Sequence, residues 1–410
     1  MTSWNETFSR KAFAAPSAVR YIGKWRVEFL GFTSPAKDRT ALLCLGGAFQ
    51  SRWSFRHVAE HLHPHMPVVV VDLPGQGNNA QEADELNFDD FAGILDALCE
   101  AEGLHRVVAL GLSYGSAIAH AFACRYPQRV EKLILGGTSA RLRDSIVATL
   151  RHSLGLIGEN EREAFATGAI LHLLNHSKRD RTGISDRLIQ RMYESIFELD
   201  EPARRRYRAN TERLIGYRMT QAPHVPTLVY VGEFDSFTSP RESWEVSRMI
   251  PGARFALIAD ADHLVPLQRQ KVELQLYHAF LLDQLPLEKV EGLKSLDRLP
   301  EERRVFERYE GGNTTIHVRY LEHGGRGFDV RLQDGSAAGF SFETPEGTTS
   351  GARIEVDVGS DTLLAHAYET GKCTRAAVIM TSMPAQHHWE SRISGLPVSM
   401  MDRRTGQRVA

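Results

Sequence analysis

Cysteine is scarce in this sequence of 410 residues, and its four cysteines form no recognisable pattern. Cys44, Cys99, Cys124 and Cys373 are far apart, and no C-x-x-C pair is present. This spacing argues against a disulfide framework and against a zinc site, so we expect no bound metal. The four thiols are interpreted as small apolar side chains.

Long apolar runs and an excess of either charge are also missing. No run reaches the roughly 18 apolar residues that a membrane-spanning helix needs. The N-terminal residues lack the basic and apolar regions of a secretion signal, so we predict a cytoplasmic protein without a membrane span. The 49 Lys and Arg residues and the 51 Asp and Glu residues nearly balance. No positive excess is left to attract nucleic acid or an anionic membrane.

The first two-thirds of the sequence alternates short apolar strands with helical segments. Most of the strands are continuous apolar runs, which is typical of strands buried on both faces of a parallel sheet. Helical patterns such as 88–101 and 116–126 separate them. This alternation predicts an α/β fold with a doubly wound sheet. The predicted strands are 27–32, 41–45, 67–72, 106–110, 132–135, 227–231 and 254–258.

The alternation stops between about residues 141 and 219, where long helical patterns and dense charge replace it. We interpret this stretch as a helical insertion that forms a lid over the sheet. His172 and His176 stand four residues apart in it. Because no carboxylate lies at a matching spacing, a packed or solvated pair is favoured over a metal site.

The last part of the chain has a different composition and hydrophobic pattern. Residues 286–301 are charged and polar and are predicted to form a linker or a short connecting helix. Beyond them, short alternating runs such as 314–320 and 353–358 are separated by glycine clusters, a pattern that predicts a small antiparallel β-barrel or sandwich. We therefore expect a sheet domain at 20–285, this linker, and a β-domain at 302–400.

One short motif carries the strongest chemical signal. Gly111-Leu-Ser113-Tyr-Gly115 follows an apolar strand and precedes a helical run of small residues. A G-x-S-x-G sequence between a strand and a helix is the pattern of a nucleophile elbow, in which a sharp turn exposes the serine above the sheet. The flanking glycines suit a turn too tight for side chains. Ser113 is therefore the candidate nucleophile.

A serine hydroxyl needs a base to accept its proton and a carboxylate to orient that base. Asp235 follows the predicted strand 227–231, and His263 follows the strand 254–258. Both positions lie at the carboxyl ends of strands, where open α/β sheets place their sites. We predict His263 as the general base and Asp235 as its acid partner, with Glu233 as a weaker candidate for the acid.

A developing oxyanion needs two backbone N–H donors. Tyr114, directly after the serine, is predicted to supply one of them. The turn after the strand 41–45 is predicted to supply the other, from Ala48 or, as the second choice, Phe49. Two glycines, Gly46 and Gly47, let this turn approach a substrate closely.

The ordered landmarks Gly46-Gly47, Asp72-x-x-Gly75-x-Gly77, the serine motif, Asp235 and His263 resemble those of the α/β-hydrolase superfamily. The resemblance covers about residues 20–285. Within the superfamily, the segments 46–55, 71–74 and 232–238 are most similar to the bacterial synthases that make the lipid part of rhamnolipids by joining two 3-hydroxyacyl chains. Gly46 replaces the usual histidine of a His-Gly pair, and Leu-Ser-Tyr at the elbow is shared with many plain hydrolases.

The resemblance implies an acyl-transfer reaction without a cofactor. Ser113 would attack a fatty-acyl ester or thioester, with acyl-CoA and acyl carrier protein thioesters as candidate substrates. The acyl group would then pass to a hydroxyacyl chain, or to water in a plain carboxylesterase or thioesterase. A lid that excludes water would favour transfer over hydrolysis. An alternative of another class is a signalling receptor whose hydrolase domain is catalytically idle.

Two motifs mark the start of the β-domain. Arg304-x-x-x-Arg308 is followed by Asp334-x-Ser336-x-x-Gly339. Together they resemble the R-x-x-x-R and D/N-x-S-x-x-G motifs of PilZ domains, which implies binding of cyclic di-GMP as a regulatory ligand. A guanidinium group can bind a phosphate or the edge of a guanine base through two parallel hydrogen bonds. Our hypothesis is that the ligand gathers the linker arginines onto the barrel and reorients the barrel against the lid.

Overall fold

A computed structural model describes residues 4–36, 40–300, 306–346, 348, 351–369, 373–380, 382–396, 401–402 and 407–408. The chain divides into two compact units. The sheet unit comprises Met1–Leu142 and Asp200–Leu299, and the barrel unit comprises Arg143–Leu199 and Pro300–Ala410. Each unit is therefore built from two separate stretches of the chain.

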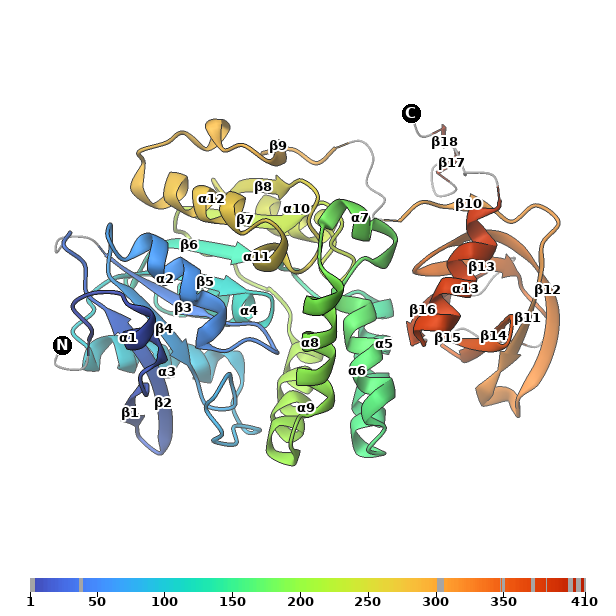
Figure 1. Ribbon diagram of the computed structural model, residues 1–410, viewed down its shortest axis with the longest axis horizontal. Coiled ribbons are helices and arrows are strands. Elements are labelled where there is room, and N and C mark those ends of the chain that lie inside the picture. The colour runs from blue at the N-terminus through green and yellow to red at the C-terminus, as the bar shows by residue number, and fades with distance from the viewer. Residues whose placement is uncertain are drawn as a thin grey trace. The chain divides into compact units, whose positions relative to one another are not determined.

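The sheet unit contains a nine-stranded sheet in the order β1-β2-β4-β3-β5-β6-β7-β8-β9 (Figure 1). Strands β3 to β8 run parallel to one another. Strands β1 and β2 at one edge and β9 at the other are antiparallel additions. The strands are β1 (Ala18–Ile22), β2 (Trp25–Phe32), β3 (Ala41–Leu45), β4 (Val68–Asp72), β5 (Val107–Leu112), β6 (Val130–Gly136), β7 (Thr227–Gly232), β8 (Arg254–Ile258) and β9 (Leu293–Leu296).

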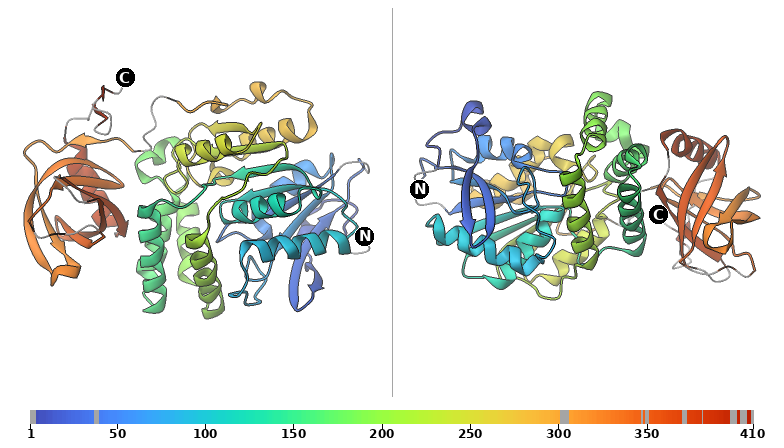
Figure 2. Two further views of the ribbon diagram at one scale, coloured as in Figure 1. Left: turned by 180° about the vertical axis from the view of Figure 1, so that it is seen from behind. Right: turned by 90° about the horizontal axis from the view of Figure 1, so that it is seen from below.

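Both faces of this sheet are covered by helices, as Figures 1 and 2 show. Successive residues of a strand point to opposite faces, so Leu43 of β3 enters one core while Leu42 and Cys44 enter the other. Helices α3 (Phe88–Ala101), α4 (Tyr114–Arg125) and α10 (Pro240–Met249) contribute to the first core. Helices α1 (Arg10–Ala14), α2 (Arg56–Leu62) and α12 (Gln270–Leu282) contribute to the second.

The predicted doubly wound sheet is confirmed, and the two strands that the sequence pattern did not indicate lie at its edges. Strand β1 is half-buried along most of its length. It pairs antiparallel with β2, to which a tight turn connects it. Strand β9 lies within the segment predicted as a linker and pairs antiparallel with β8. Neither strand is a continuous apolar run, because an edge strand can be held by backbone hydrogen bonds without two buried faces.

The stretch expected as a helical insertion contains five α-helices and the short 3₁₀ helix His176–Lys178. Four belong to the barrel unit: α5 (Asp144–Gly158), α6 (Arg162–Leu173), α7 (Arg179–Thr182) and α8 (Asp186–Phe197). The fifth, α9 (Glu201–Gly216), belongs to the sheet unit. There it contacts the loops around the serine motif, since Asn210 donates to the carbonyl of Gly75 at 2.9 Å.

The C-terminal stretch forms a closed antiparallel barrel of six strands. Its ring runs β12-β11-β14-β15-β16-β13 and closes through the pairing of β13 with β12, while the short β10 is added beside β12. The ring confirms the predicted barrel. Its elements are β10 (Tyr309–Glu310), β11 (Thr315–Tyr320), β12 (Arg326–Ser336), β13 (Gly339–Glu343), β14 (Arg353–Val358), β15 (Asp361–Glu369), β16 (Cys373–Met380) and the following helix α13 (Met383–Ser394).

Alternating burial along the strands explains the barrel core. In β11 and β14, every second residue is buried, as expected when one face of each strand points inward. The fully buried Trp389 of α13 packs edge-on against Phe340 of β13, with 5.3 Å between ring centres. Helix α13 therefore completes the core of the barrel.

Helix α5 packs against β15 and β16 inside the barrel unit. The partly buried His172 of α6 places Nε2 2.7 Å from the carbonyl oxygen of Ile379 in β16. Lys178 forms an ion pair with Glu307, with 3.1 Å between Nζ and Oε1. The helices α5–α8 and the barrel are thus joined by backbone, ionic and packing contacts.

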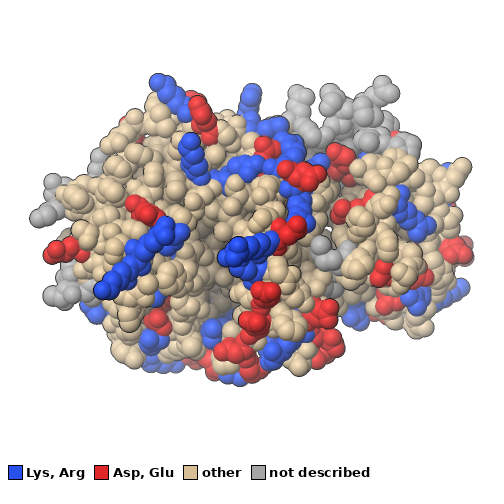
Figure 3. Space-filling model, in the orientation of Figure 1, with Lys and Arg blue, Asp and Glu red and all other residues tan. Residues whose placement is uncertain are grey.

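Charged side chains of both signs intermingle on the face shown in Figure 3. Pairs such as Arg205 with Glu82 and Arg241 with Glu245 place opposite charges beside each other. This mixing agrees with the formal net charge of −2. Among the described residues, no helix combines the length and apolar character needed to cross a bilayer.

Candidate active site

Ser113 occupies the turn between β5 and α4 in a strained backbone conformation, with φ 50° and ψ −116°. Such a conformation is uncommon for a residue with a side chain and concentrates at functional sites. The turn is tight because a Cβ on Gly111 would lie 2.3 Å from the carbonyl oxygen of Gly115. A Cβ on Gly115 would lie 2.2 Å from the carbonyl oxygen of Leu45 in β3. Both glycines are thus required by close backbone approach.

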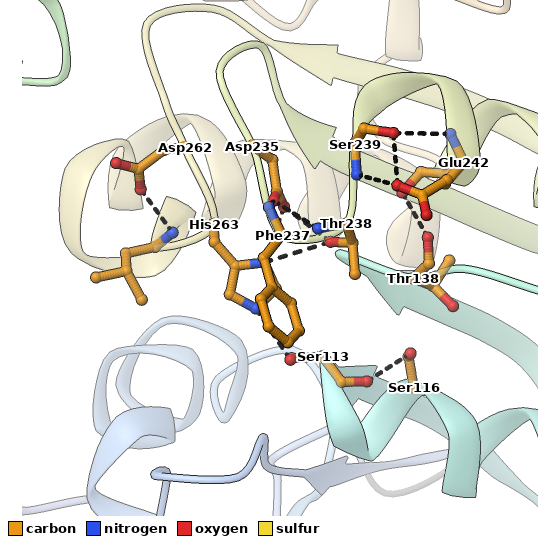
Figure 4. Close-up of polar contacts among 12 residues, drawn as sticks. Ser113, Ser116, Thr138, Asp235, Phe237, Thr238, Ser239, Glu242, Asp262 and His263 are labelled. Atoms are coloured by element: carbon orange, nitrogen blue, oxygen red, sulfur yellow. Dashed lines mark hydrogen bonds and ion pairs between the residues drawn. The ribbon is translucent and has the colours of Figure 1, made fainter. Parts of the chain in front are cut away.

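The structure brings Ser113, His263 and Asp235 together in hydrogen-bond contact (Figure 4). His263 Nε2 lies 3.0 Å from Ser113 Oγ, and His263 Nδ1 lies 2.9 Å from Asp235 Oδ2. The side chains of His263 and Asp235 are only 5% and 1% exposed. Water is therefore largely kept from the imidazole–carboxylate contact, which strengthens it.

The weaker candidate for the acid, Glu233, lies elsewhere. Its carboxylate pairs with Lys294 of β9 at 3.1 Å and accepts the backbone N–H of Asp260 at 3.1 Å. The loop after β7 instead turns so that residue 235 faces His263. Both acids lie beyond the end of β7 at Gly232, where the chain turns and the backbone N–H of Asp235 donates to the carbonyl of Gly232, so the two side chains have different partners.

The environment of His263 acts on its pKa in opposite directions. Burial opposes the charged imidazole, whereas attraction to Asp235, the hydrogen bond with it and the nearby Asp262 favour the charged form. The net effect raises the pKa of His263 above its ordinary value. Because a general base must be neutral before it accepts a proton, the active fraction increases as pH rises through this raised pKa.

The loop after β3, which carries the predicted oxyanion donor Ala48, lies beside the serine. A Cβ on Gly47 would lie 3.2 Å from Ser113 Cβ, so this loop lies directly against the nucleophile. Gly47 N–H donates to Gln50 Oε1 at 2.7 Å, which leaves the next amide along the loop, that of Ala48, as the candidate donor. Tyr114 is the first residue of α4, and the first amides of a helix have no partner inside it. The second choice, Phe49, stacks on Tyr207 of α9 with ring centres 5.2 Å apart.

Two side chains that organise this site were not found by sequence reasoning. Thr238 donates its hydroxyl to Asp235 Oδ2 at 2.8 Å. Arg213 of α9 donates to Tyr114 Oη at 2.7 Å and to the carbonyl of Ala83 at 2.6 Å. A hydroxyl three residues after the acid was a visible signal for Thr238, whereas Arg213 stood in a helix full of other arginines.

The barrel motifs meet at the hairpin between β12 and β13. Arg308 forms an ion pair with the buried Asp334, which also accepts the hydroxyl of Ser341 at 2.9 Å. Ser336 donates to the carbonyl of Gly339 at 3.0 Å and so closes the hairpin. Arg304 lies outside the described residues. Four of the five predicted ligand-binding residues are therefore adjacent.

The hairpin also has structural demands of its own. A Cβ on Gly339 would lie 2.6 Å from the carbonyl oxygen of Ala376, so β16 packs closely against this position. Trp389 Nε1 donates to the carbonyl of Ser336 at 2.9 Å. The close packing of the hairpin thus accounts for Ser336 and Gly339. The ion pair between Arg308 and Asp334 places charged groups beside it.

Residues 40–154 match the family model described as the alpha/beta hydrolase fold. The sheet unit has the α/β-hydrolase fold. An α/β hydrolase from a deep-sea metagenome library superposes on this chain with a TM-score of 0.60 and 16% identity, covering 66% of this chain and 98% of the other. A thermophilic esterase from Thermogutta terrifontis gives a TM-score of 0.56 and 25% identity, covering 66% and 98%.

Curated relatives extend this likeness to named activities. A protein named (R)-3-hydroxydecanoyl-ACP:CoA transacylase from Pseudomonas aeruginosa is 23% identical over 274 residues, which cover 64% of this chain and 87% of the relative. A pimeloyl-[acyl-carrier protein] methyl ester esterase from Neisseria meningitidis is 28% identical over 245 residues, covering 55% and 73%. The prediction that this chain is an enzyme with the α/β-hydrolase fold is confirmed.

Proposed function

We propose that this α/β-hydrolase chain is a serine-nucleophile acyltransferase that acts on fatty-acyl thioesters or esters and forms a hydroxyacyl-ester lipid. The observation that carries this proposal is the pair of contacts that His263 makes, 3.0 Å to Ser113 Oγ and 2.9 Å to Asp235 Oδ2. The names of the Pseudomonas and Neisseria relatives support acyl-CoA or acyl carrier protein thioesters as the substrate class.

The first half of the reaction forms an acyl-enzyme. Ser113 Oγ attacks the acyl carbonyl carbon while its proton passes to His263 Nε2. The N–H groups of Ala48 and Tyr114 stabilise the oxyanion that develops on the carbonyl oxygen. When the intermediate collapses, the bond to the leaving thiol or alcohol breaks and His263 returns the proton to that group.

The second half transfers the acyl group. The hydroxyl of a second 3-hydroxyacyl chain gives its proton to His263 Nε2 as its oxygen attacks the acyl-serine carbonyl. Ser113 leaves and recovers its proton, and an ester joins the two chains. Water in place of the hydroxyl would give free acid, the outcome of a plain carboxylesterase or thioesterase. Each step balances with the groups of this site alone.

Product analysis with a 3-hydroxyacyl-CoA distinguishes these outcomes. The full chain is expected to convert the thioester to free CoA and a dimeric hydroxyacyl ester, detected by mass spectrometry. A matched sample of the Ser113→Ala variant is expected to form neither product. Free acid without dimeric ester would reject transfer and leave a hydrolase, and intact thioester would reject this substrate class.

A second proposal concerns regulation by cyclic di-GMP at the barrel hairpin. The supporting observation is that the partly exposed Arg308 and the buried Asp334, from two separate motifs, form an ion pair. A phosphate or guanine edge could replace Asp334 as the partner of the guanidinium group. Glu307, which pairs with Lys178, lies between Arg304 and Arg308 in the chain. Movement of the arginines would thus be passed to the helices α5–α8, which connect to the sheet unit at both ends.

Calorimetry with cyclic di-GMP tests this regulation. The wild type is expected to bind with a measurable heat, and Arg304→Ala/Arg308→Ala is expected to bind at least about 10-fold more weakly because charged hydrogen bonds are lost. The matched control is Arg331→Ala, an exposed arginine of β12 that contacts Asn313 and the carbonyl of Gly312. Equal heats for the wild type and the double variant would contradict the proposal, as would an acyl-transfer rate that the nucleotide leaves unchanged.

A further inference from the structure

Four hydrogen bonds converge on the carboxylate of Asp235 (Figure 4). Oδ1 accepts the backbone N–H groups of Phe237 at 2.9 Å and Thr238 at 2.8 Å. Oδ2 accepts the Thr238 hydroxyl at 2.8 Å and faces His263 Nδ1 at 2.9 Å. The backbone donors hold one oxygen in place, so the oxygen that faces the imidazole is shared between His263 and the Thr238 hydroxyl.

The hydrogen atoms available at this junction determine the tautomer of His263. Thr238 Oγ1 also lies 3.3 Å from His263 Nδ1. The hydroxyl has one hydrogen, and the carboxylate has none, so the hydroxyl hydrogen goes to Asp235. Nδ1 must then carry a hydrogen, which faces Asp235 Oδ2 and Thr238 Oγ1. Nε2 is then unprotonated and can accept the hydrogen of the Ser113 hydroxyl. The contact with Asp235 therefore sets the tautomer that a general base needs, and the Thr238 hydroxyl agrees with it by giving its hydrogen to the same carboxylate oxygen.

The loop that carries Thr238 is itself held at two points. Ser239 caps α10 together with Glu242, whose carboxylate accepts the backbone N–H of Ser239 at 2.9 Å. Ser243 of α10 donates to the carbonyl of Thr138, in the loop after β6, at 2.7 Å. Thr238 is only 4% exposed, so its hydroxyl does not exchange freely between Asp235 and solvent.

We infer that Thr238 is a positioning residue for acyl transfer, whose hydroxyl aligns the Asp235 carboxylate with His263 Nδ1. The inference rests on the proposed function, since it assigns a role within the same site. Its hydroxyl contacts the carboxylate of Asp235 and the imidazole of His263, and among the contacts of the described residues it makes none with Ser113. Thr238 thus acts through His263 and not on the reacting atoms.

Removing the hydroxyl has two physical consequences. Asp235 Oδ2 loses one of its two partners and keeps only His263 Nδ1, so the angle between the carboxylate and the imidazole is fixed less firmly. The charge of the carboxylate is also less neutralised, so the imidazolium is held more strongly and the pKa of His263 rises further. The groups that face His263 are Asp235, Thr238 and Phe237 from the loop after β7, Asp262 from its own loop, Ser113 from the elbow and Gly137 from the loop after β6. Of these, only Asp235 and Asp262 carry charge.

Two variants separate the hydroxyl from the rest of the side chain. Thr238→Val keeps the branched shape and the backbone N–H, and its kcat is expected to fall about 10- to 100-fold, the cost of one lost hydrogen bond to a charged group. KM is expected to stay within about 2-fold, because Thr238 does not touch substrate. The acid limb of the kcat/KM profile is expected to move to higher pH. Thr238→Ser restores the hydroxyl and is expected to recover most of the rate.

A second readout needs no substrate. Nuclear magnetic resonance of the imidazole nitrogens, with the His263 signal identified by its loss in His263→Gln, reports the tautomer and the titration of His263. The wild type is expected to show a hydrogen on Nδ1 at high pH, and Thr238→Val is expected to titrate at higher pH. An unchanged titration in Thr238→Val would overturn the inference even if the enzyme is active. An enzyme that turns over no acyl substrate but shows this titration shift would overturn the proposed function instead. If Thr238→Ser is as impaired as Thr238→Val, packing and not the hydroxyl matters.

Discussion

Replacing Ser113 by alanine is expected to lower kcat by about 10⁴- to 10⁶-fold, because the residual site can stabilise an oxyanion but cannot form an acyl-enzyme. The effect is large because the serine, held at φ 50°, is the one hydroxyl within 3.0 Å of His263 Nε2 among the contacts of the described residues. Hydrolysis of a chromogenic ester and labelling by a fluorophosphonate probe measure the loss. The wild type is expected to gain one phosphonyl group, and Ser113→Ala none.

The matched control is Ser391→Ala, an exposed serine of α13 in the barrel unit. This variant should label and turn over as the wild type does, since it lies outside the site. If Ser113→Ala still labels, a different serine is the nucleophile. A wild type that neither labels nor hydrolyses any ester would favour the catalytically idle receptor, because only an activated serine reacts with the probe.

Gly115→Ala is expected to cause a large loss of stability in the sheet unit. Its Cβ would lie 2.2 Å from the carbonyl oxygen of Leu45 and 2.7 Å from that of Gly46. Both atoms belong to the backbone, so no side-chain rotation relieves the overlap and β3 must move away from α4. We expect the free energy of unfolding to fall by about 3 kcal/mol or more, measured by urea denaturation of the full chain.

Gly155→Ala provides the control for the chemical change itself. Gly155 lies in α5, and a Cβ at this position meets no atom within 4 Å. Because alanine is the better helix former, this variant should be more stable than the wild type by about 0.5–1 kcal/mol. Equal unfolding curves for Gly115→Ala and the wild type would show that the elbow tolerates a side chain.

The central strands were predictable because a strand that is buried on both faces needs apolar side chains at consecutive positions. Strand β8 was expected at 254–258 and is found at Arg254–Ile258, and the helix expected at 88–101 is found at Phe88–Ala101. The edge strand β9, with buried Ser295 and exposed Lys294, has no such pattern. Its place depends on the free edge of β8, which no local feature of residues 293–296 reveals.

The three catalytic candidates were predictable because they come in the order serine, acid, histidine along the chain, each after a predicted strand. The elbow sequence indicated Ser113, and the ends of two later strands indicated Asp235 and His263, which the structure brings into contact. Thr238 was missed because its role depends on how the loop after β7 turns its hydroxyl toward Asp235. Arg213 was missed because its contact with Tyr114 spans 99 residues of sequence.

The amino-acid sequence alone determined the central strands and helices of the sheet unit, the sharp turn at Ser113, and which residue types could perform acyl transfer. These features are local, since apolar periodicity and glycine placement act through neighbouring residues. Only the tertiary structure decided that α9 belongs with the sheet and α5–α8 with the barrel, and that a threonine hydroxyl completes the surroundings of Asp235. The first depends on packing between distant segments and the second on how the loop after β7 turns, and neither can be read from local sequence patterns.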